Sequence, residues 1–231
     1  RLNIVTEGYK KYNNLPQEKK VACVFRDILK NVEVHIDDDE LLVGELAAPA
    51  WAAALYPEFS INWVKEEIEA SRRGELPWFD QRKNDKYYIP DEVIDQILKA
   101  TEFWEGKSID SAILAECTEE EHKGGCCGGK GVYSEQLYTY NGVGHVCANY
   151  EKLFNGGFGA IEKRVREKKA AIQLGDPEGR KQQIFYDAAL TVLEGVYIYF
   201  NKYAALAREK AETAEPVRKA ELLRIASNCE W

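Results

Sequence analysis

Hydrophobic positions recur at intervals of three and four residues over much of the chain, which is the spacing that gathers apolar side chains on one face of an α-helix. Proline or glycine marks several of the predicted helix ends, since proline suits a first helical turn and glycine often follows the last one. The predicted helices cover residues 4–31 on both sides of a turn at Pro16, then 60–74, 90–106, 160–173, 181–214 and the stretch from Pro216 onward.

Two departures from the helical pattern predict other structure. Residues 32–36 alternate apolar and polar positions, which is typical of a short half-buried strand, and residues 41–43 form a second short apolar run. From residue 108 to 139 the periodicity weakens, and five of the eight residues in 124–131 are glycine. We therefore expect a mainly α fold with a few short strands, and an irregular loop over 117–139.

The sequence also predicts where one helix begins and ends, and how another helix is packed. Ser60 is placed to cap a helix that stops near Gly74. The middle of the 181–214 helix is apolar nearly all round, so we expect it to lie between other layers of the protein.

Composition excludes several classes of protein. The 231 residues carry 31 basic and 39 acidic side chains, a formal net charge of −8, whereas a nucleic-acid binder needs a basic surface. No run approaches the roughly 18 apolar residues that span a bilayer. The six cysteines are few and irregularly spaced, which favours a reducing cytoplasm over a secreted disulfide framework.

The glycine-rich loop holds two candidate sites. "GGCCGGK" has the spacing of a phosphate-binding loop, but Gly131 stands where magnesium binding needs Ser or Thr, so a plain loop is favoured. Cys117, His122, Cys126 and Cys127 offer zinc-ligand chemistry within eleven residues. Free thiols in a loop are the favoured alternative, and a non-catalytic helical metal-binding module stays open as a function.

The stretch "YNGVGHVCANYEKLFNGGFGAI", residues 140–161, gives the most specific candidate. His145 lies in a glycine-rich loop that leads into a helix, and a neutral imidazole can both donate to and accept from a substrate hydroxyl. The alternative is a histidine that fixes its own loop. The glycines of "NGGFGA" favour a helix break over a dinucleotide site, and Asp37, Asp38 and Asp39 favour a solvated turn over a cation site.

In this order, the segments "HIDDDELLVGE", "YPEFSINWVKEEI", "FWEGKSI", the "GH" stretch and "RIASNCEW" resemble the N-terminal third of glycyl radical enzymes. The similar branch contains diol, glycerol and hydroxyproline dehydratases. The resemblance covers residues 1–231 and implies the N-terminal helical part of a β/α barrel.

The resemblance also implies a chemistry. In this family a glycyl radical, installed by a radical-SAM activating enzyme, passes to a cysteine whose thiyl takes a hydrogen atom from the substrate. Neither the cysteine loop nor the glycine loop of the family occurs here, and Cys126 and Cys127 are not assigned as the thiyl. We therefore expect this chain to be the opening part of a longer enzyme, inert by itself, with no metal and no bound organic cofactor.

By resemblance, His145 matches the histidine that lines the substrate pocket of dehydratase-like members, and Tyr138, Tyr140 and Asn141 are expected along the same wall. This favours a dehydratase that eliminates water from a hydroxylated small molecule. A lyase acting on a C–N, C–S or C–C bond, of the choline lyase, decarboxylase or formate-lyase type, is the alternative. The implied partners are the remainder of the chain, the activating enzyme, the substrate and a second subunit in a homodimer, under anaerobic conditions in the cytoplasm.

Overall fold

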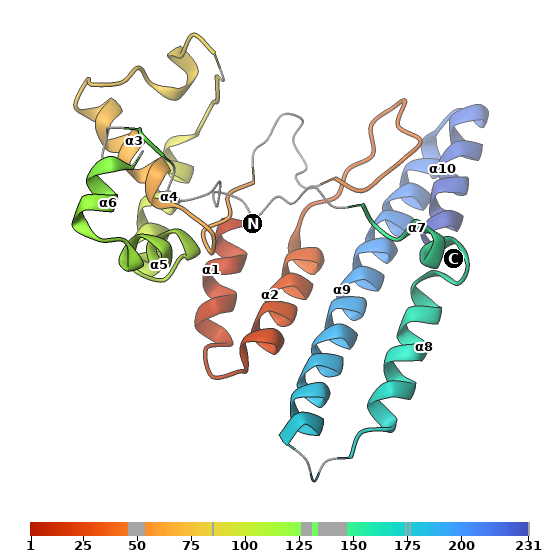
Figure 1. Cartoon of the computed structure of the whole chain (residues 1–231). Helices are drawn as coiled ribbons and strands as arrows, with labels where there is room; N and C mark the ends of the chain where they lie inside the picture. The colour runs from red at the N-terminus through yellow and green to blue at the C-terminus, as the bar shows by residue number, and fades with distance from the viewer. Residues whose placement is uncertain are drawn as a thin grey trace. The chain divides into compact units, whose positions relative to one another are not determined.

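A computed structural model of the protein describes residues 1–45, 54–84, 86–125, 131–133, 147–173, 175 and 177–230. The regular structure of these residues is helical (Figure 1), and a single bridge between Gly125 and Tyr133 is the one strand-like pairing among them. The chain divides into two compact units, one formed by Arg1–Thr6 with Leu55–His145 and the other by Glu7–Ala54 with Val146–Trp231.

The first unit contains short helices. It comprises the first residues of α1 (Leu2–Lys11), then α3 (Asn62–Arg72), the 3₁₀ turn η1 (Phe79–Gln81), α4 (Asp91–Trp104), α5 (Ile109–Glu116) and α6 (Glu119–Gly124). Helices α3 and α4 pack together, and their buried apolar side chains include Ile68 and Ile97. The indole of Trp104 donates a hydrogen bond to the Thr6 hydroxyl at 2.9 Å, and both residues are buried. This bond ties α4 to the N-terminal residues.

Ser60 does not cap the helix that follows it, so that prediction was wrong. The N-cap of α3 is Ile61, and no side chain caps it. The Ser60 hydroxyl instead donates to Oδ2 of Asp110 at 2.9 Å. Both residues are buried, and a buried carboxylate needs such donors more than a helix end does. The predicted stop near Gly74 is confirmed, since this glycine has φ +76° after the helix ends at Arg72.

The second unit is built around one long helix. It comprises the rest of α1, then α2 (Gln17–Asn31), α7 (Tyr150–Phe154), α8 (Gly157–Ala170), α9 (Pro177–Thr213) and α10 (Pro216–Glu230). Helix α9 packs against α2, α8 and α10, which confirms the expected position between layers. A cluster of buried apolar residues lies between α9 and α10: Ile36, Tyr203, Ala204, Ala207, Ala211, Leu222, Ile225 and Ala226.

The strand predicted for residues 32–36 is not formed with any partner in the described part of the chain. The alternation is real, because Ile36 is 1% exposed and Val34 packs against the cluster between α9 and α10. A single extended segment on a helical surface buries alternate side chains just as a strand on a sheet does, so the periodicity alone could not separate the two. The few strands expected in the fold are therefore absent from the described residues.

The stretch from 108 to 139 contains more helix than predicted. Helix α5 begins after Ser108, whose hydroxyl accepts from the Ser111 amide, and α6 lies inside the loop that we expected to be irregular from 117 onward. Residues 126–130 and 134–139 of that loop lie outside the described residues. None of the described helices has the length and apolar content needed to cross a membrane.

Candidate functional site

The candidate substrate residues Tyr138, Tyr140, Asn141 and His145 lie outside the described residues. The structure does describe the chain that follows them. Residues 147–149 lead into α7, and the Asn149 side chain caps this short helix by accepting from the Lys152 amide at 3.1 Å. The described chain therefore resumes two residues after His145 and continues into α7 and α8.

The glycines between α7 and α8 form a helix break, as the sequence predicted. Gly157 has φ +63°, a conformation that side chains other than glycine rarely adopt, and it opens α8. A Cβ at Gly156 would lie 2.6 Å from the Cβ of Ala160, so a larger residue would collide with the first turn of the helix. These glycines are required by the turn itself.

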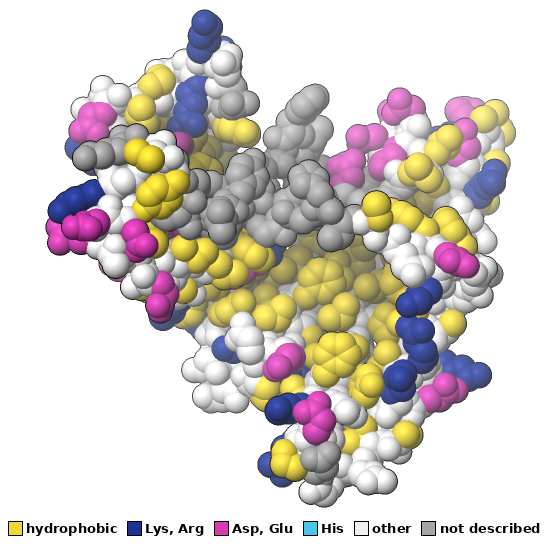
Figure 2. All heavy atoms as spheres, in the orientation of Figure 1, with side chains coloured by type: hydrophobic (Ala, Val, Ile, Leu, Met, Phe, Trp, Pro, Cys, Tyr) yellow, Lys and Arg dark blue, Asp and Glu magenta, His cyan; other side chains and the backbone are white. Residues whose placement is uncertain are grey.

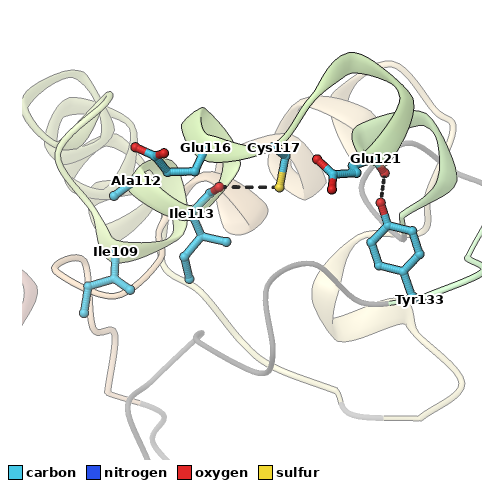
Figure 3. A pocket seen from close by; sticks show the side chains of 7 residues that line it. All are labelled: Ile109, Ala112, Ile113, Glu116, Cys117, Glu121 and Tyr133. Atoms are coloured by element: carbon cyan, nitrogen blue, oxygen red, sulfur yellow. Dashed lines mark hydrogen bonds between the residues drawn. The ribbon is translucent and has the colours of Figure 1, made fainter.

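The Cys117 region forms a shallow hollow of about 560 Å³ in the first unit (Figure 3). Ile109, Ala112 and Ile113 supply an apolar wall from α5. The Cys117 thiol donates to the Ile113 carbonyl at 3.5 Å, and the Tyr133 hydroxyl donates to the carbonyl of Glu121. A thiol in such a bond to its own helix end behaves as a small apolar group rather than as a prepared nucleophile.

The zinc hypothesis for this loop gains no support from the residues that the structure describes. Cys117 is half-buried at the end of α5, whereas His122 is exposed on α6. Among described residues, no group of three metal-ligating side chains includes either of them. Cys126 and Cys127 lie outside the described residues, so the complete set of four is not tested.

Within the described residues, one group of possible metal-ligating atoms does come together, in the turn that follows α2. Single ligand atoms of His35, Asp37 and Glu40 lie within 4.8 Å of one another. His35 Nε2 lies 3.4 Å from a carboxylate oxygen of Glu45 and 4.0 Å from Oδ2 of Asp37. Its Nδ1 is buried and has no hydrogen-bond partner there, whereas a metal-bound histidine nearly always donates from its second nitrogen.

The prediction of a solvated turn at Asp37, Asp38 and Asp39 is confirmed, since all three are exposed. Glu40 accepts from the Asp37 amide at 3.0 Å and closes the turn. The imidazole of His35 faces the carboxylates of Glu45 and Asp37. The arrangement is a hydrogen-bonded turn with a histidine–carboxylate contact.

Two tyrosines that sequence reasoning missed hold the end of this segment. The Tyr199 hydroxyl donates to the carbonyl of Glu45 at 2.8 Å, and the Glu45 amide donates to the Tyr203 hydroxyl at 3.2 Å. Burial, followed by the hydrogen bond with Tyr203, raises the pKa of Tyr199 well above its ordinary value. The Tyr199 hydroxyl therefore stays protonated at neutral pH. The two side chains together fix the backbone just before residue 46.

The whole chain matches one protein family. The match covers residues 1–231 and is described as pyruvate formate lyase-like, so the chain belongs to this family of glycyl radical enzymes. The expected family is thereby confirmed, and the helical fold agrees with it.

Two curated relatives and one solved structure show which members of the family this chain resembles. The chain is 38% identical, over its full length, to a (2S)-3-sulfopropanediol dehydratase from Klebsiella oxytoca. Over 97% of its length it is 27% identical to an isethionate sulfite-lyase from Desulfovibrio desulfuricans. Its structure resembles the glycerol-bound B12-independent glycerol dehydratase from Clostridium butyricum with a TM-score of 0.84 and 29% identity, over 99% of this chain.

The chain spans only part of each relative. It covers 27% of both curated relatives and 28% of the glycerol dehydratase chain, which is nearer to a quarter than to the expected third. It corresponds to their N-terminal part. The barrel that the resemblance implies is not seen among the described residues, whose fold is mainly helical.

Proposed function

We propose that the full-length protein is a glycyl radical dehydratase that eliminates water from a small hydroxylated substrate. The observation that carries this proposal is the 38% identity with a sulfopropanediol dehydratase along the whole chain. The structural likeness to a glycerol dehydratase supports the same reaction class, because both names describe loss of water from vicinal hydroxyls.

In this proposal the reaction begins when a cysteine thiyl, located outside residues 1–231, takes a hydrogen atom from a substrate C–H bond. The sulfur becomes a thiol and the substrate becomes a carbon radical. In a vicinal diol, the hydroxyl on the radical carbon then loses a proton and becomes a carbonyl. The neighbouring hydroxyl takes up a proton and leaves as water, so the radical moves to the neighbouring carbon. The product radical then takes the hydrogen atom back from the thiol, so the sum is substrate giving product and water, with no external oxidant or reductant.

His145 is proposed to hold the departing hydroxyl and to help its protonation, with Tyr138, Tyr140 and Asn141 along the same wall. Imidazole suits this role because it exchanges protons near neutral pH. General acid–base assistance by one side chain contributes about 10²- to 10⁴-fold in rate. We therefore expect His145→Gln in the full-length enzyme to lower kcat by an amount in that range.

The matched control for that variant is His122→Gln. His122 is exposed on α6 and is not one of the four proposed substrate residues, so its replacement should leave kcat unchanged. Glycyl radical content, measured by electron paramagnetic resonance, must be equal in both variants and the wild type. An unchanged kcat in His145→Gln at full radical content would remove His145 from the mechanism.

The proposed partners follow from the family. The full-length protein would be activated by a radical-SAM enzyme, act as a cytoplasmic homodimer under anaerobic conditions, and need neither a metal nor an organic cofactor in its own barrel. Elemental analysis of the folded, chelator-treated protein tests the last point. A tightly held metal would instead favour the metal-binding module considered for the Cys117–Cys127 loop.

The experiment that tests the function uses full-length protein, activated without oxygen, against a panel of substrates. The panel contains 3-sulfopropanediol, 1,2-propanediol, glycerol, trans-4-hydroxyproline and isethionate. Formation of an aldehyde or imine with release of water, from at least one hydroxylated compound, is the expected result. A protein that carries the radical and dehydrates none of them would contradict the proposal.

A second candidate is a lyase that cleaves a C–S bond. It is favoured by the 27% identity with an isethionate sulfite-lyase over nearly the whole chain. The same panel separates the two, because isethionate cleavage releases sulfite whereas dehydration releases none. Sulfite as the main product would replace the dehydratase proposal by this one.

A further inference from the structure

A groove of about 580 Å³ lies in the second unit, where α7 and the start of α8 meet α9 and the end of α10. Figure 1 shows α7 and the beginning of α8 next to the C-terminal end of α10. The lining includes Leu153 and Phe154 from α7, Phe158 from α8, Phe200 and Asn201 from α9, and Cys229 from α10. Every one of these residues belongs to the second unit.

The groove is apolar at its centre. The ring of Phe154 is 81% exposed, and the Phe158 and Phe200 rings meet edge to face with centroids 5.6 Å apart. Figure 2 shows hydrophobic side chains at the surface around α7. A row of basic side chains lies beside them, along α8. An exposed aromatic ring in a preformed groove is a typical contact point for another polypeptide.

The polar groups at the rim suit a polypeptide backbone better than an ion. Asn201 and Asn228 present side-chain amides, which can both donate to and accept from peptide groups. The one charged residue of the lining, Glu230, is engaged by Arg208 at 2.8 Å. Gly159 carries no side chain and has open space where a Cβ would lie, so a neighbouring backbone can approach the start of α8 closely.

The position of the groove indicates which polypeptide fills it. Its α10 wall consists of Asn228, Cys229 and Glu230, so chain that continues past Trp231 begins at its rim. The curated relatives are nearly four times as long as this segment, which covers 27% of them. A tethered segment reaches a nearby groove at an effective concentration of about millimolar, well above that of a second copy in solution.

We propose that the polypeptide following Trp231 in the full-length protein packs into this groove and places an apolar side chain against Phe154. The proposal rests on the proposed function only in requiring a longer chain. The groove is then an internal contact of the complete enzyme.

Photo-crosslinking in the full-length protein tests this contact. The photoreactive residue p-benzoylphenylalanine replaces Phe154, and light and ¹⁵N-labelled copies are mixed before irradiation. The control places the same residue at position 217, where Val217 is 76% exposed at the far end of α10 and outside the groove. We expect adducts from position 154 to residues beyond 231 of the same copy, several-fold above the yield from position 217.

Two results would overturn the proposal. Adducts that join light to heavy chains would assign the groove to a second copy. A yield from position 154 no higher than from position 217 would mean that the groove stays open, or that only a small molecule enters it.

A smaller substitution covers the case in which the photoreactive side chain prevents folding. Phe154→Ser should lower the melting temperature of the full-length protein more than Val217→Ser does, because only the first loses a covered contact. Equal melting temperatures would count against the proposal. Neither experiment requires the glycyl radical, so a crosslinked but inactive protein would refute the proposed function and leave this contact standing.

Discussion

Trp104 illustrates how one buried polar contact orders the first unit. Its side chain is 1% exposed, and its indole nitrogen donates to Thr6, whose hydroxyl donates in turn to the Leu2 carbonyl at 2.9 Å. Trp104→Phe keeps an aromatic ring but removes the donor and part of the volume. We expect a loss of about 2–3 kcal/mol in the free energy of unfolding, from the lost hydrogen bond and the cavity together.

Denaturant unfolding of the full-length protein measures this change. Tyr88→Phe is the matched control, because Tyr88 is 81% exposed and its change should stay within about 0.5 kcal/mol. Equal losses in the two variants would mean that the Trp104–Thr6 contact contributes nothing specific.

Glu121 gives a prediction about pH. Its carboxylate accepts from the Thr118 amide and from the Thr118 hydroxyl, each at 2.8 Å, and these bonds, the backbone one first, hold its pKa below 4.5. A lowered pKa in the folded state stabilises α6 above the unfolded pKa. This stabilisation disappears as pH falls through the folded value.

Carbon-13 NMR of labelled glutamate carboxyls measures the pKa directly, with Glu121→Gln to assign the signal. Thr118→Ala removes the hydroxyl donor and should move the midpoint upward, toward 4.5. A wild-type midpoint no lower than that of Thr118→Ala would mean that the hydroxyl bond of the capping box does not form in solution.

The helices could be predicted from the sequence where the signals for them are local. The long amphipathic runs gave α2, α4, α9 and α10 with nearly correct bounds. Helix α6 was missed, although Thr118 and Glu121 stand three residues apart and form a capping box. The glycines that follow Thr118 and Glu121 indicate a loop, which is the opposite signal.

Contacts between distant residues could not be predicted in the same way. Tyr199 and Tyr203 have the i, i+4 spacing of side chains on one helix face, but nothing local points to Glu45, which lies 154 residues before Tyr199. For the candidate site, the residues alone singled out His145 but could not decide between a substrate contact and a histidine that fixes its own loop. The resemblance to a family favoured the substrate contact. The described residues place the neighbours of His145 from Cys147 onward, and its own role is still a proposal.

The packing of α9 on α2 gives a prediction at the scale of elements. A Cβ at Gly195 would lie 2.9 Å from the Cα of Arg26 and 3.3 Å from Cδ1 of Leu29. Alanine favours a helix over glycine by about 1 kcal/mol. The clash involves backbone that cannot rotate away, so we expect Gly195→Ala to destabilise the protein by about 1–3 kcal/mol.

Lys210→Ala on the same helix is the control. Lys210 is exposed near the end of α9, so this substitution tests helix propensity without a change in packing, and its effect should stay within about 0.5 kcal/mol. Thermal unfolding of both variants gives the comparison. Stabilisation by Gly195→Ala would show that α2 and α9 lie farther apart in solution than in this structure.

At the scale of the whole molecule, the apolar side chains that stay exposed indicate where further polypeptide could bind. Figure 2 shows hydrophobic side chains gathered at the surface over α2 and α9 as well as around α7. In the second unit, Phe25 is 40% exposed, Phe185 60% and Phe154 81%. Surfaces of this kind on one unit are usually interfaces, and the length of the relatives offers a covering polypeptide for them.

The last prediction concerns these 231 residues in isolation. Without a covering polypeptide, the exposed rings should bind a hydrophobic dye such as anilinonaphthalene sulfonate, and the loss of packing should broaden thermal unfolding. The full-length protein should bind little dye and unfold sharply. Both proteins are compared at equal molar concentration, with size-exclusion chromatography to separate dye bound by monomers from dye bound by aggregates. A sharp melt and no dye binding by the short chain would mean that α2, α7 and α9 are stable without further polypeptide, and the case for a covering segment would then rest on the crosslinking at position 154 alone.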